Sequence, residues 1–215
     1  MRGFNVPNAS RTSKGIPIVN LLTLEKGEQI KTLQPVPKDY KFNDIEFKNL
    51  LFVTKNGIVK RTSVSEFENI NRNGKIAISL KEDDELAFVK LTTGNDEIII
   101  AGSNGKAVRF NEDQIRVMGR SAAGVTGFNC DGSEVVGVAL SNEGKTILSI
   151  SENGYGKRSY LEDYRLTSRG KKGVRTINIT EKTGKLVSVK AVNGDEDVMI
   201  VSSSGIMIRT SLQNV

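Results

Sequence analysis

The sequence feature that most constrains the fold of this chain is a pattern that returns about every fifty residues. In each copy a short polar stretch leads to a glycine, and an arginine follows four residues after that glycine. Successive glycines of this pattern are 48, 49 and 51 residues apart, and the arginines keep the same spacings. Such self-similarity is typical of proteins built from repeated supersecondary units. The four pairs are Gly57 with Arg61, Gly105 with Arg109, Gly154 with Arg158 and Gly205 with Arg209.

A second glycine marks a later position of each repeat. It stands at Gly74, Gly124 and Gly173, and Gly15 fits the same phase. The step from Gly15 to Gly74 is 59 residues, longer than the period, and two prolines within 35–41 mark the extra segment as a loop. The chain starts and ends partway through a repeat, so we expect its 215 residues to be a piece of a longer array.

Each repeat contains short runs that are typical of β-strands. Residues 50–54, 97–101, 146–151 and 197–202 are rich in Ile, Val and Leu, and each run leads into a Gly-centred turn. Asn-Gly between two such runs predicts a type I′ hairpin. Two further strands are expected in each repeat, the first at 75–80, 125–129 and 174–179 and the second at 86–91, 135–140 and 186–192. The helical segment that the pattern suggests, 63–67, is long enough for only a single turn.

Four short strands in a period of about fifty residues, without long helices, are typical of the blades of a β-propeller. We therefore predict an all-β fold of four-stranded blades, with about four to five blades present and the ends incomplete. A β-solenoid has much shorter coils, and a β-sandwich does not repeat so regularly. We expect one domain over 1–215, with approximate repeats at 1–50, 51–97, 98–145, 146–196 and, in part, 197–215.

The composition excludes several kinds of active site. The chain has no histidine, so a Ser/His/Asp triad, a Cys/His dyad and a His-ligated metal site are impossible. Cys130 is the single cysteine and has no disulfide partner in the chain. Gly144-Lys145-Thr146 is similar to the end of a phosphate-binding loop, but Ala139 stands where that motif needs its first glycine. We expect neither catalytic activity nor a metal site in this chain.

No membrane segment is evident in the sequence. No run approaches the roughly 18 consecutive apolar residues of a membrane-spanning helix. The first residues lack the apolar region of a secretory signal. We therefore expect a soluble, intracellular protein.

Basic and acidic residues fall at different phases of the repeat. The chain has 31 Lys and Arg against 25 Asp and Glu, a formal net charge of +6. Cations gather around the Gly-x-x-x-Arg pattern and around the second glycine, most densely at 165–175. Acids concentrate elsewhere, for example at 83–85, 96–97 and 195–197. In a ring of blades a fixed phase becomes a fixed radius, so this sorting predicts a basic belt distinct from an acidic rim.

A continuous basic belt on a curved surface suits duplex DNA, because each Lys or Arg that meets a phosphate releases condensed counterions. No recognition helix is evident, so we expect phosphate contacts and DNA deformability to outweigh base readout. The candidate DNA-binding residues are Arg11, Lys14, Lys60, Arg61, Arg72, Lys75, Lys106, Arg109, Arg116, Arg120, Lys157, Arg158, Arg165, Arg169, Lys171, Lys172, Arg175 and Arg209.

A structural role is the alternative for every member of this set. Lys and Arg on edge strands also prevent edge-to-edge pairing, and a repeated arginine can pair with an acid of the neighbouring blade. For a single residue such as Arg109 or Arg209 we weigh the two interpretations equally. For the cluster at 165–175 we favour DNA contact. A protein that binds an acidic protein partner through the same belt is a further alternative.

Several segments resemble a known family. Residues 51–61, followed by 71–78, closely resemble the C-terminal domain of DNA gyrase A subunits, as do 152–158, 163–166 and 169–173. The resemblance extends over essentially the whole chain, and it implies a β-pinwheel, a propeller-like ring of blades whose basic outer edges wrap DNA. In that family of type IIA topoisomerases the wrap directs strand passage, so that ATP-driven cycles introduce negative supercoils.

The resemblance also implies partners and limits. The partners are double-stranded DNA, the B subunit and the rest of the A subunit, in an A2B2 complex of the bacterial cytoplasm that is associated with the nucleoid. This part holds no cofactor, because ATP and Mg²⁺ act elsewhere in the holoenzyme, and it lacks the catalytic tyrosine region. The gyrase-defining box Gln-Arg-Arg-Gly-Gly-Lys-Gly does not occur, and residues 169–173 are only a partial likeness. The similar, more weakly wrapping domain of the topoisomerase IV A-type subunit is therefore the nearest alternative.

Overall fold

A computed structural model describes residues 6–69 and 74–214 of the chain. The described part is built from short β-strands, and its helical segments are single 3₁₀ turns, which confirms the predicted all-β fold. The 3₁₀ turns used below are η4 (Val64–Phe67), η5 (Glu112–Gln114), η6 (Leu161–Asp163) and η7 (Leu212–Asn214), and η2 (Ile18–Asn20) and η3 (Lys38–Tyr40) precede them. The strands are β1 (Lys41–Phe42), β2 (Ile45–Glu46), β3 (Asn49–Thr54), β4 (Ile58–Ser63), β5 (Leu86–Thr92), β6 (Glu97–Gly102), β7 (Lys106–Asn111), β8 (Val125–Thr126), β9 (Val135–Leu140), β10 (Thr146–Ser151), β11 (Gly156–Tyr160), β12 (Val174–Arg175), β13 (Leu186–Val192), β14 (Asp197–Val201) and β15 (Met207–Ser211).

Antiparallel hairpins form the framework of the repeats: β3 pairs with β4, β6 with β7, β10 with β11 and β14 with β15. In the first hairpin the N–H of Gly57 donates to the carbonyl oxygen of Thr54 at 3.1 Å. Of Asn56 and Gly57, only Gly57 has a positive φ, +84°. A type I′ turn needs positive φ at both central residues, so that prediction is wrong. The loop is instead a turn followed by one left-handed glycine.

Each complete blade borrows its outermost strand from the following repeat. The first sheet has the order β5-β3-β4-β8, and the second blade has the order β9-β6-β7-β12. β8 pairs with β4 through Ile58 and Thr126, and β12 pairs with β7 through Ala107 and Val174. The sequence places these borrowed strands correctly but extends them too far, because only two residues of each pair before the chain turns away. Residues 75–80, expected to be extended, form no strand.

The second glycine permits this exchange. A Cβ at Gly173 would lie 2.1 Å from the carbonyl oxygen of Ala107, and a Cβ at Gly124 would lie 2.5 Å from that of Val59. Any side chain at these positions would push the borrowed strand away from the blade that it completes. Gly124 and Gly173 therefore have a structural role: each lets the borrowed strand approach the neighbouring blade.

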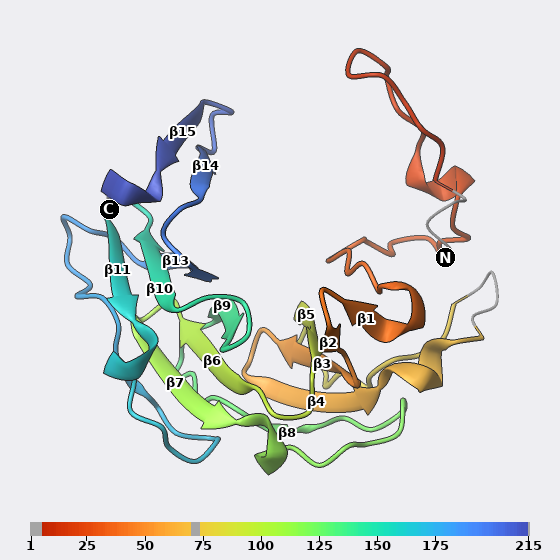
Figure 1. Cartoon of the computed structure of the whole chain (residues 1–215), viewed down its shortest axis with the longest axis horizontal. Coiled ribbons are helices and arrows are strands. Elements are labelled where there is room, and N and C mark those ends of the chain that lie inside the picture. Colours follow the sequence, from red (N-terminus) through yellow and green to blue (C-terminus); the bar gives the residue numbers. More distant parts are fainter. Residues whose placement is uncertain (1–5, 70–73, 215) are drawn as a thin grey trace.

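The hydrophobic cores lie between successive blades, although the parallel pairing of β13 with β9 joins the second and third blades into one seven-stranded sheet. One core joins β3 and β4 of the first blade to the second blade through buried residues such as Leu51, Val53, Ile98 and Phe110. A second core joins the other face of β6 to the third blade. Alternate residues of β6 therefore face different cores, as expected for a strand buried on both sides. The stacking gives an arc in which β5, β9 and β13 line the concave side and β4, β7 and β11 lie toward the convex side (Figure 1).

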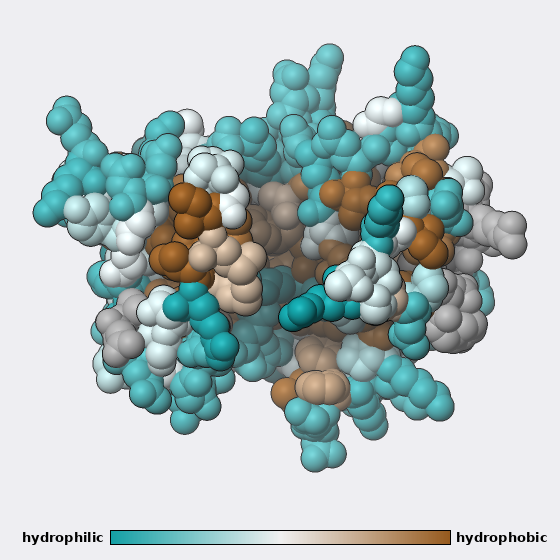
Figure 2. All heavy atoms as spheres, turned by 90° about the horizontal axis from the view of Figure 1, so that it is seen from above, coloured by the Kyte–Doolittle hydropathy of each residue, from teal (hydrophilic) through white to brown (hydrophobic). Residues whose placement is uncertain are grey.

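The two ends of the arc carry exposed apolar side chains. β14 and β15 form a two-stranded ribbon, and Met199 and Ile208 on it are more than half exposed. In the N-terminal segment Val19 and Leu33 are also exposed. A view onto the open side of the arc shows hydrophobic patches on either side of a hollow (Figure 2). Among the described residues, no helix has the length and apolar character needed to cross a membrane.

Candidate nucleic-acid interface

Two of the four arginines of the Gly-x-x-x-Arg pattern lie inside the joints between blades. Arg109, on β7, has a side chain only 13% exposed and donates through Nε to Oε2 of Glu97 at 2.8 Å. Its Nη1 donates to the carbonyl oxygens of Leu161 and Tyr164 at 2.9 and 3.0 Å, around η6 of the next blade. Each of the three nitrogens of this guanidinium donates to a group within the protein. We therefore withdraw Arg109 from the DNA-binding set.

Arg61 occupies the equivalent position one blade earlier and is also buried. Its Nη1 lies 2.7 Å from Oε1 of Glu112, whose side chain is fully buried in η5 of the next blade. Oε1 of Glu112 also accepts from the hydroxyl of Thr92 at 3.1 Å, and Oε2 accepts from the backbone N–H of Asp96 at 3.1 Å. This network neutralises Arg61 away from solvent, although Nε of Arg61 has no hydrogen-bond partner among the described residues. Arg61 is withdrawn from the DNA-binding set because it is buried and paired with Glu112.

Lys60 is fully buried, contrary to the expectation that it meets DNA. Its Nζ donates to the carbonyl oxygens of Ala77, at 2.5 Å, and of Arg120, and it lies 5.7 Å from the centre of the Phe52 ring. Burial, and then the charge of Arg120, lower the pKa of Lys60. The ammonium group ties together three segments and is not available to a phosphate in this structure.

The other two arginines of the pattern differ from the first two. Arg158, on β11, is half-buried, and its Nη1 has no hydrogen-bond partner among the residues that the structure describes. Arg209, on β15, has a side chain 74% exposed and donates through Nε to Oδ2 of Asp197 at 2.7 Å. The acids Glu97 and Asp197, assigned by the sequence to a separate rim, are thus partners of arginines in the belt.

The arginines four residues before the second glycine clamp one blade onto the previous one. Arg169 donates through Nε to the carbonyl oxygen of Gln114 at 3.1 Å and through Nη1 to that of Thr126 at 2.9 Å. Arg120 lies 3.7 Å from the carboxylate of Glu66 through its Nε. Lys75 is half-buried and donates to the carbonyl oxygen of Glu66 at 3.2 Å. These three side chains are committed to backbone or acid, although each is partly accessible.

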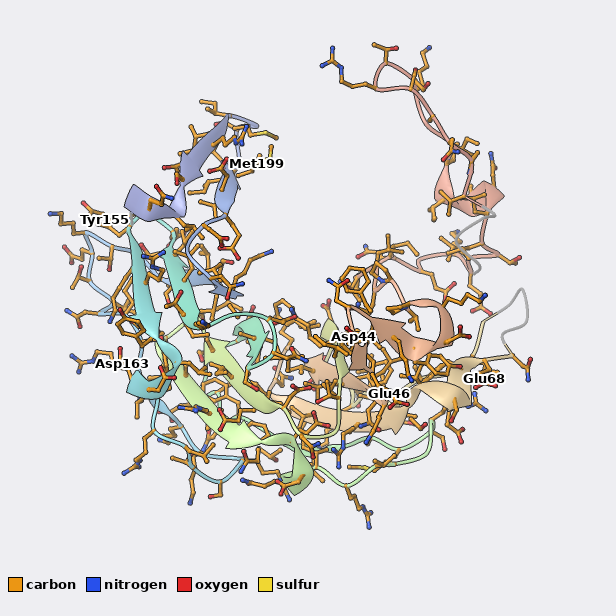
Figure 3. All side chains as sticks on the ribbon, in the orientation of Figure 1. Asp44, Glu46, Glu68, Tyr155, Asp163 and Met199 are labelled. Carbon is orange, nitrogen blue, oxygen red and sulfur yellow. The ribbon has the colours of Figure 1, made fainter. Side chains whose placement is uncertain are left out.

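Most of the remaining candidates are exposed, and most have no acidic partner among the described residues. Nitrogen-tipped side chains project from the convex edge of the arc (Figure 3). Arg72 lies outside the described residues. Lys172 and the half-buried Lys106 approach Asp131. The exposed members of the predicted set that have no ion-pair partner in 6–69 and 74–214 are Arg11, Lys14, Arg116, Lys157, Arg165, Lys171 and Arg175.

Residues 165–175 form the most cationic element of this edge, as the sequence predicts. The loop is held against β7 because the N–H of Thr167 donates to the carbonyl oxygen of Arg109 at 2.9 Å. Between loop and strand lies a cavity of about 180 Å³, whose lining includes Arg165, Thr167, Lys171 and Lys172. Hydroxyl and cationic groups around one opening are the donors that phosphate oxygens accept from.

The equivalent loop of the preceding repeat, 116–126, is much less cationic. Ala122 and Ala123 stand where the later loop has Lys171 and Lys172, and Thr126 stands in place of Arg175. Positive charge is therefore distributed unevenly along the convex edge. It is concentrated at the joint between the second and third blades.

Comparisons with known proteins agree with this architecture. The chain matches the family model for the DNA gyrase C-terminal domain, beta-propeller, over residues 3–37, 48–93, 96–142, 145–193 and 196–215. The DNA gyrase A subunit of Ureaplasma parvum serovar 3 is 47% identical over 216 residues, which are 100% of this chain and 25% of that protein. The DNA gyrase A subunit of Staphylococcus epidermidis is 47% identical over 218 residues, or 100% and 24% of the two chains.

Solved structures give the same result. The C-terminal domain of DNA topoisomerase IV superposes with a TM-score of 0.81 at 25% identity, covering 94% of this chain and 62% of the other. The DNA gyrase A C-terminal domain superposes with a TM-score of 0.79 at 27% identity, covering 94% and 67%. The chain spans about a quarter of the length of the curated relatives named above. Its blades, its repeated sequence pattern and its match to the family model show that the chain belongs to the family of DNA gyrase C-terminal β-propeller domains.

Proposed function

We propose that this chain binds duplex DNA along its convex edge and bends the duplex around that edge. The observation that carries this proposal is the exposed loop 165–175, in which Arg165, Lys171 and Arg175 have no acidic partner among the described residues. Unpaired cations on one curved edge attract a polyanion because their contact with phosphate releases counterions. Family membership supports the same assignment.

The proposed binding depends on the DNA backbone and not on base sequence. The described part of the chain offers 3₁₀ turns of three or four residues and no longer helix to place in a major groove. The exposed cations of 165–175 can meet phosphates, which every duplex sequence presents, and a bent duplex adds a dependence on deformability. We therefore expect DNA affinity to vary little between unrelated sequences. The small differences that remain should follow how readily each duplex bends.

In the whole enzyme the bound duplex would be presented to the strand-passage gate with a defined hand. We place the chain in a gyrase A subunit, within an A2B2 complex with the B subunit that uses ATP to introduce negative supercoils. The two solved C-terminal domains are almost equally similar in structure to this chain, so the structures do not separate gyrase from topoisomerase IV. The 47% identity to gyrase A subunits is the observation that supports gyrase.

A charge-reversal experiment tests the location of the interface. Lys171→Glu with Lys172→Glu should weaken binding of a fluorescent duplex at least about tenfold at about 50 mM salt, because the phosphate contact of Lys171 is lost and two added negative charges repel the duplex. The matched control is Lys185→Glu with Lys190→Glu, because both lysines are exposed. Lys190 lies on the concave-side strand β13, and Lys185 is the residue immediately before that strand. Equal losses in the two double variants would contradict an interface on the convex edge.

The salt dependence separates DNA binding from recognition of an acidic protein. Binding through several phosphates should weaken steeply between about 50 and 200 mM salt and should not depend on duplex sequence. We also propose that this binding needs neither ATP nor Mg²⁺, so EDTA should leave the dissociation constant for DNA unchanged. If the wild-type chain does not retain any duplex at low salt, the proposed function is wrong.

A further inference from the structure

We propose that Asp131 competes internally with DNA phosphate at the cationic loop 165–175 and so lowers the DNA affinity of the chain. In this arrangement the carboxylate of Asp131 holds Lys172 and Lys106 until a phosphate takes its place. The proposal rests on the DNA binding proposed above. It adds a residue that lowers DNA affinity, whereas the cations of loop 165–175 by themselves would only attract DNA.

The contacts of Asp131 are those that a bound anion would make. Nζ of Lys172 lies 2.8 Å from Oδ1 of Asp131, and Nζ of Lys106 lies 3.9 Å from Oδ2. The three side chains are 54%, 40% and 42% exposed for Lys172, Lys106 and Asp131, so the group is open to solvent and to ligand. Lys172 also lines the cavity between the loop and β7. A phosphate that enters there meets a lysine already bound to a carboxylate.

The backbone fixes Asp131 beside the loop. The N–H of Asn129 donates to the carbonyl oxygen of Lys171 at 3.1 Å, and Oδ1 of Asn129 accepts from the N–H of Asp131 at 3.1 Å. Asp131 itself has a φ of +51°, which Asp and Asn adopt more readily than most residues. The pairing is therefore built into a turn that is anchored on residue 171, and Asn can replace Asp131 without a change of backbone.

The charge on Asp131 persists at neutral pH. The hydrogen bond from Lys172 and then its charge lower the pKa of Asp131, and Lys106 adds to the effect. A carboxylate with a lowered pKa is ionised throughout the range in which DNA binding is measured. Its negative charge then acts both on the two lysines and on any phosphate that approaches them.

The repeat supplies a matched position without this arrangement. Asp131 follows Gly105 by 26 residues, and Asp83 follows Gly57 by the same number. Both residues have positive φ, +63° for Asp83. At the positions equivalent to Lys106 and Lys172 the earlier repeat has Ile58 and Ala123. Asp83 is exposed and forms no ion pair within the described ranges, so it is the same turn acid without the lysines.

The experiment compares Asp131→Asn with Asp83→Asn by fluorescence anisotropy of a labelled duplex. Asp131→Asn should bind roughly threefold to tenfold more tightly at about 50 mM salt, since one more lysine is free to meet a phosphate. That gain should shrink by roughly a factor of three at about 200 mM salt, as expected for one added phosphate contact. Asp83→Asn, which removes the same charge, should change the affinity less than about twofold.

A double-mutant cycle shows whether the gain passes through the lysine. Lys172→Gln should cost little affinity in the wild-type chain and should remove most of the gain in the Asp131→Asn background. Equal affinity gains in the Asp131 and Asp83 variants, or the same cost of Lys172→Gln in both backgrounds, would overturn the proposal. In either case wild-type binding would remain, so this failure is distinguishable from a failure of the proposed function.

Discussion

At the scale of single residues, the same arginine of the repeat has a different role in different blades. Arg109 is enclosed by Glu97 and two carbonyl oxygens of the next blade, whereas Arg209 is exposed beside Asp197. A charged group that is withdrawn from water needs its partners, because removing one leaves the other buried and unpaired. An exposed pair in water contributes much less.

This difference predicts two unequal effects on stability. Arg109→Gln should lower the free energy of unfolding by about 2 kcal/mol, less than for a fully buried pair because Glu97 is 24% exposed. Arg209→Gln should lower it by less than about 0.5 kcal/mol. Urea denaturation followed by circular dichroism measures both values. Similar losses in the two variants would show that the joint around Arg109 is not a stabilising contact.

Asp96 gives a prediction about pH. Burial raises the pKa of Asp96, and the nearby carboxylate of Glu112 adds to the rise. Hydrogen bonds from Thr93 to Asp96 partly offset it. An acid with a raised pKa in the folded state contributes stability below its unfolded pKa and loses it as the pH rises through the folded value. Asp96→Asn does not titrate, so its stability relative to wild type should increase between about pH 4 and about pH 7. Urea midpoints at the two pH values test this, and a constant difference would contradict it.

At the scale of elements, the sequence predicts most of the strands but not which sheet they join. Hairpins such as β6 with β7 follow from runs of Ile and Val around a glycine, and the single turn at η4 follows from its length. The transfer of β12 to the blade of β7 cannot be deduced from one repeat, because the repeat has the same composition whether its strand stays or is exchanged. The close approach of Gly173 to Ala107 is visible only in three dimensions.

The sequence likewise predicts one part of the candidate site and does not predict another. Loop 165–175 is predicted because several cations without acids stand together in sequence, and such a cluster must reach solvent. The burial of Arg61 was missed because its partner, Glu112, belongs to the next repeat and lies 51 residues away. The pairing of Arg109 with Glu97 had a usable signal, since the acid precedes the arginine by 12 residues, as Asp197 precedes Arg209.

The close approach of the exchanged segment to Gly105 predicts that alanine is more destabilising there than at Gly154, the matched control. A Cβ at Gly105 would lie 2.6 Å from the carbonyl oxygen of Ile177, in the chain that follows β12, whereas a Cβ at Gly154 meets nothing within 4 Å among the described residues. Both glycines have positive φ, so alanine costs about 1–2 kcal/mol of conformational strain at either. Gly105→Ala should be at least about 2 kcal/mol more destabilising than Gly154→Ala. Thermal unfolding of the two variants measures the difference, and equal losses would contradict a close approach there.

At the scale of the whole molecule, the blades share one architecture but not one charge. The residues that hold neighbouring blades together, including Lys60, Arg61 and Arg109, use part of the positive charge that the sequence counts. Among the described residues, exposed cations without an ion-pair partner are densest at 165–175, on the convex edge (Figure 1). We therefore expect a bound duplex to be held most firmly at the joint between the second and third blades, with weaker contacts along the rest of the arc.

The measurement that tests this account most directly is a plasmid topology assay. Relaxed, closed-circular DNA is incubated with the chain, treated with a topoisomerase and freed of protein, and the linking-number distribution is then compared with that of a sample without the chain. If the duplex wraps around the convex edge with one hand, it traps writhe, so the distribution should shift in one direction in proportion to bound protein, and the Lys171→Glu with Lys172→Glu variant should shift it much less. An unchanged distribution at saturating wild-type protein would contradict a wrap of one hand around that edge.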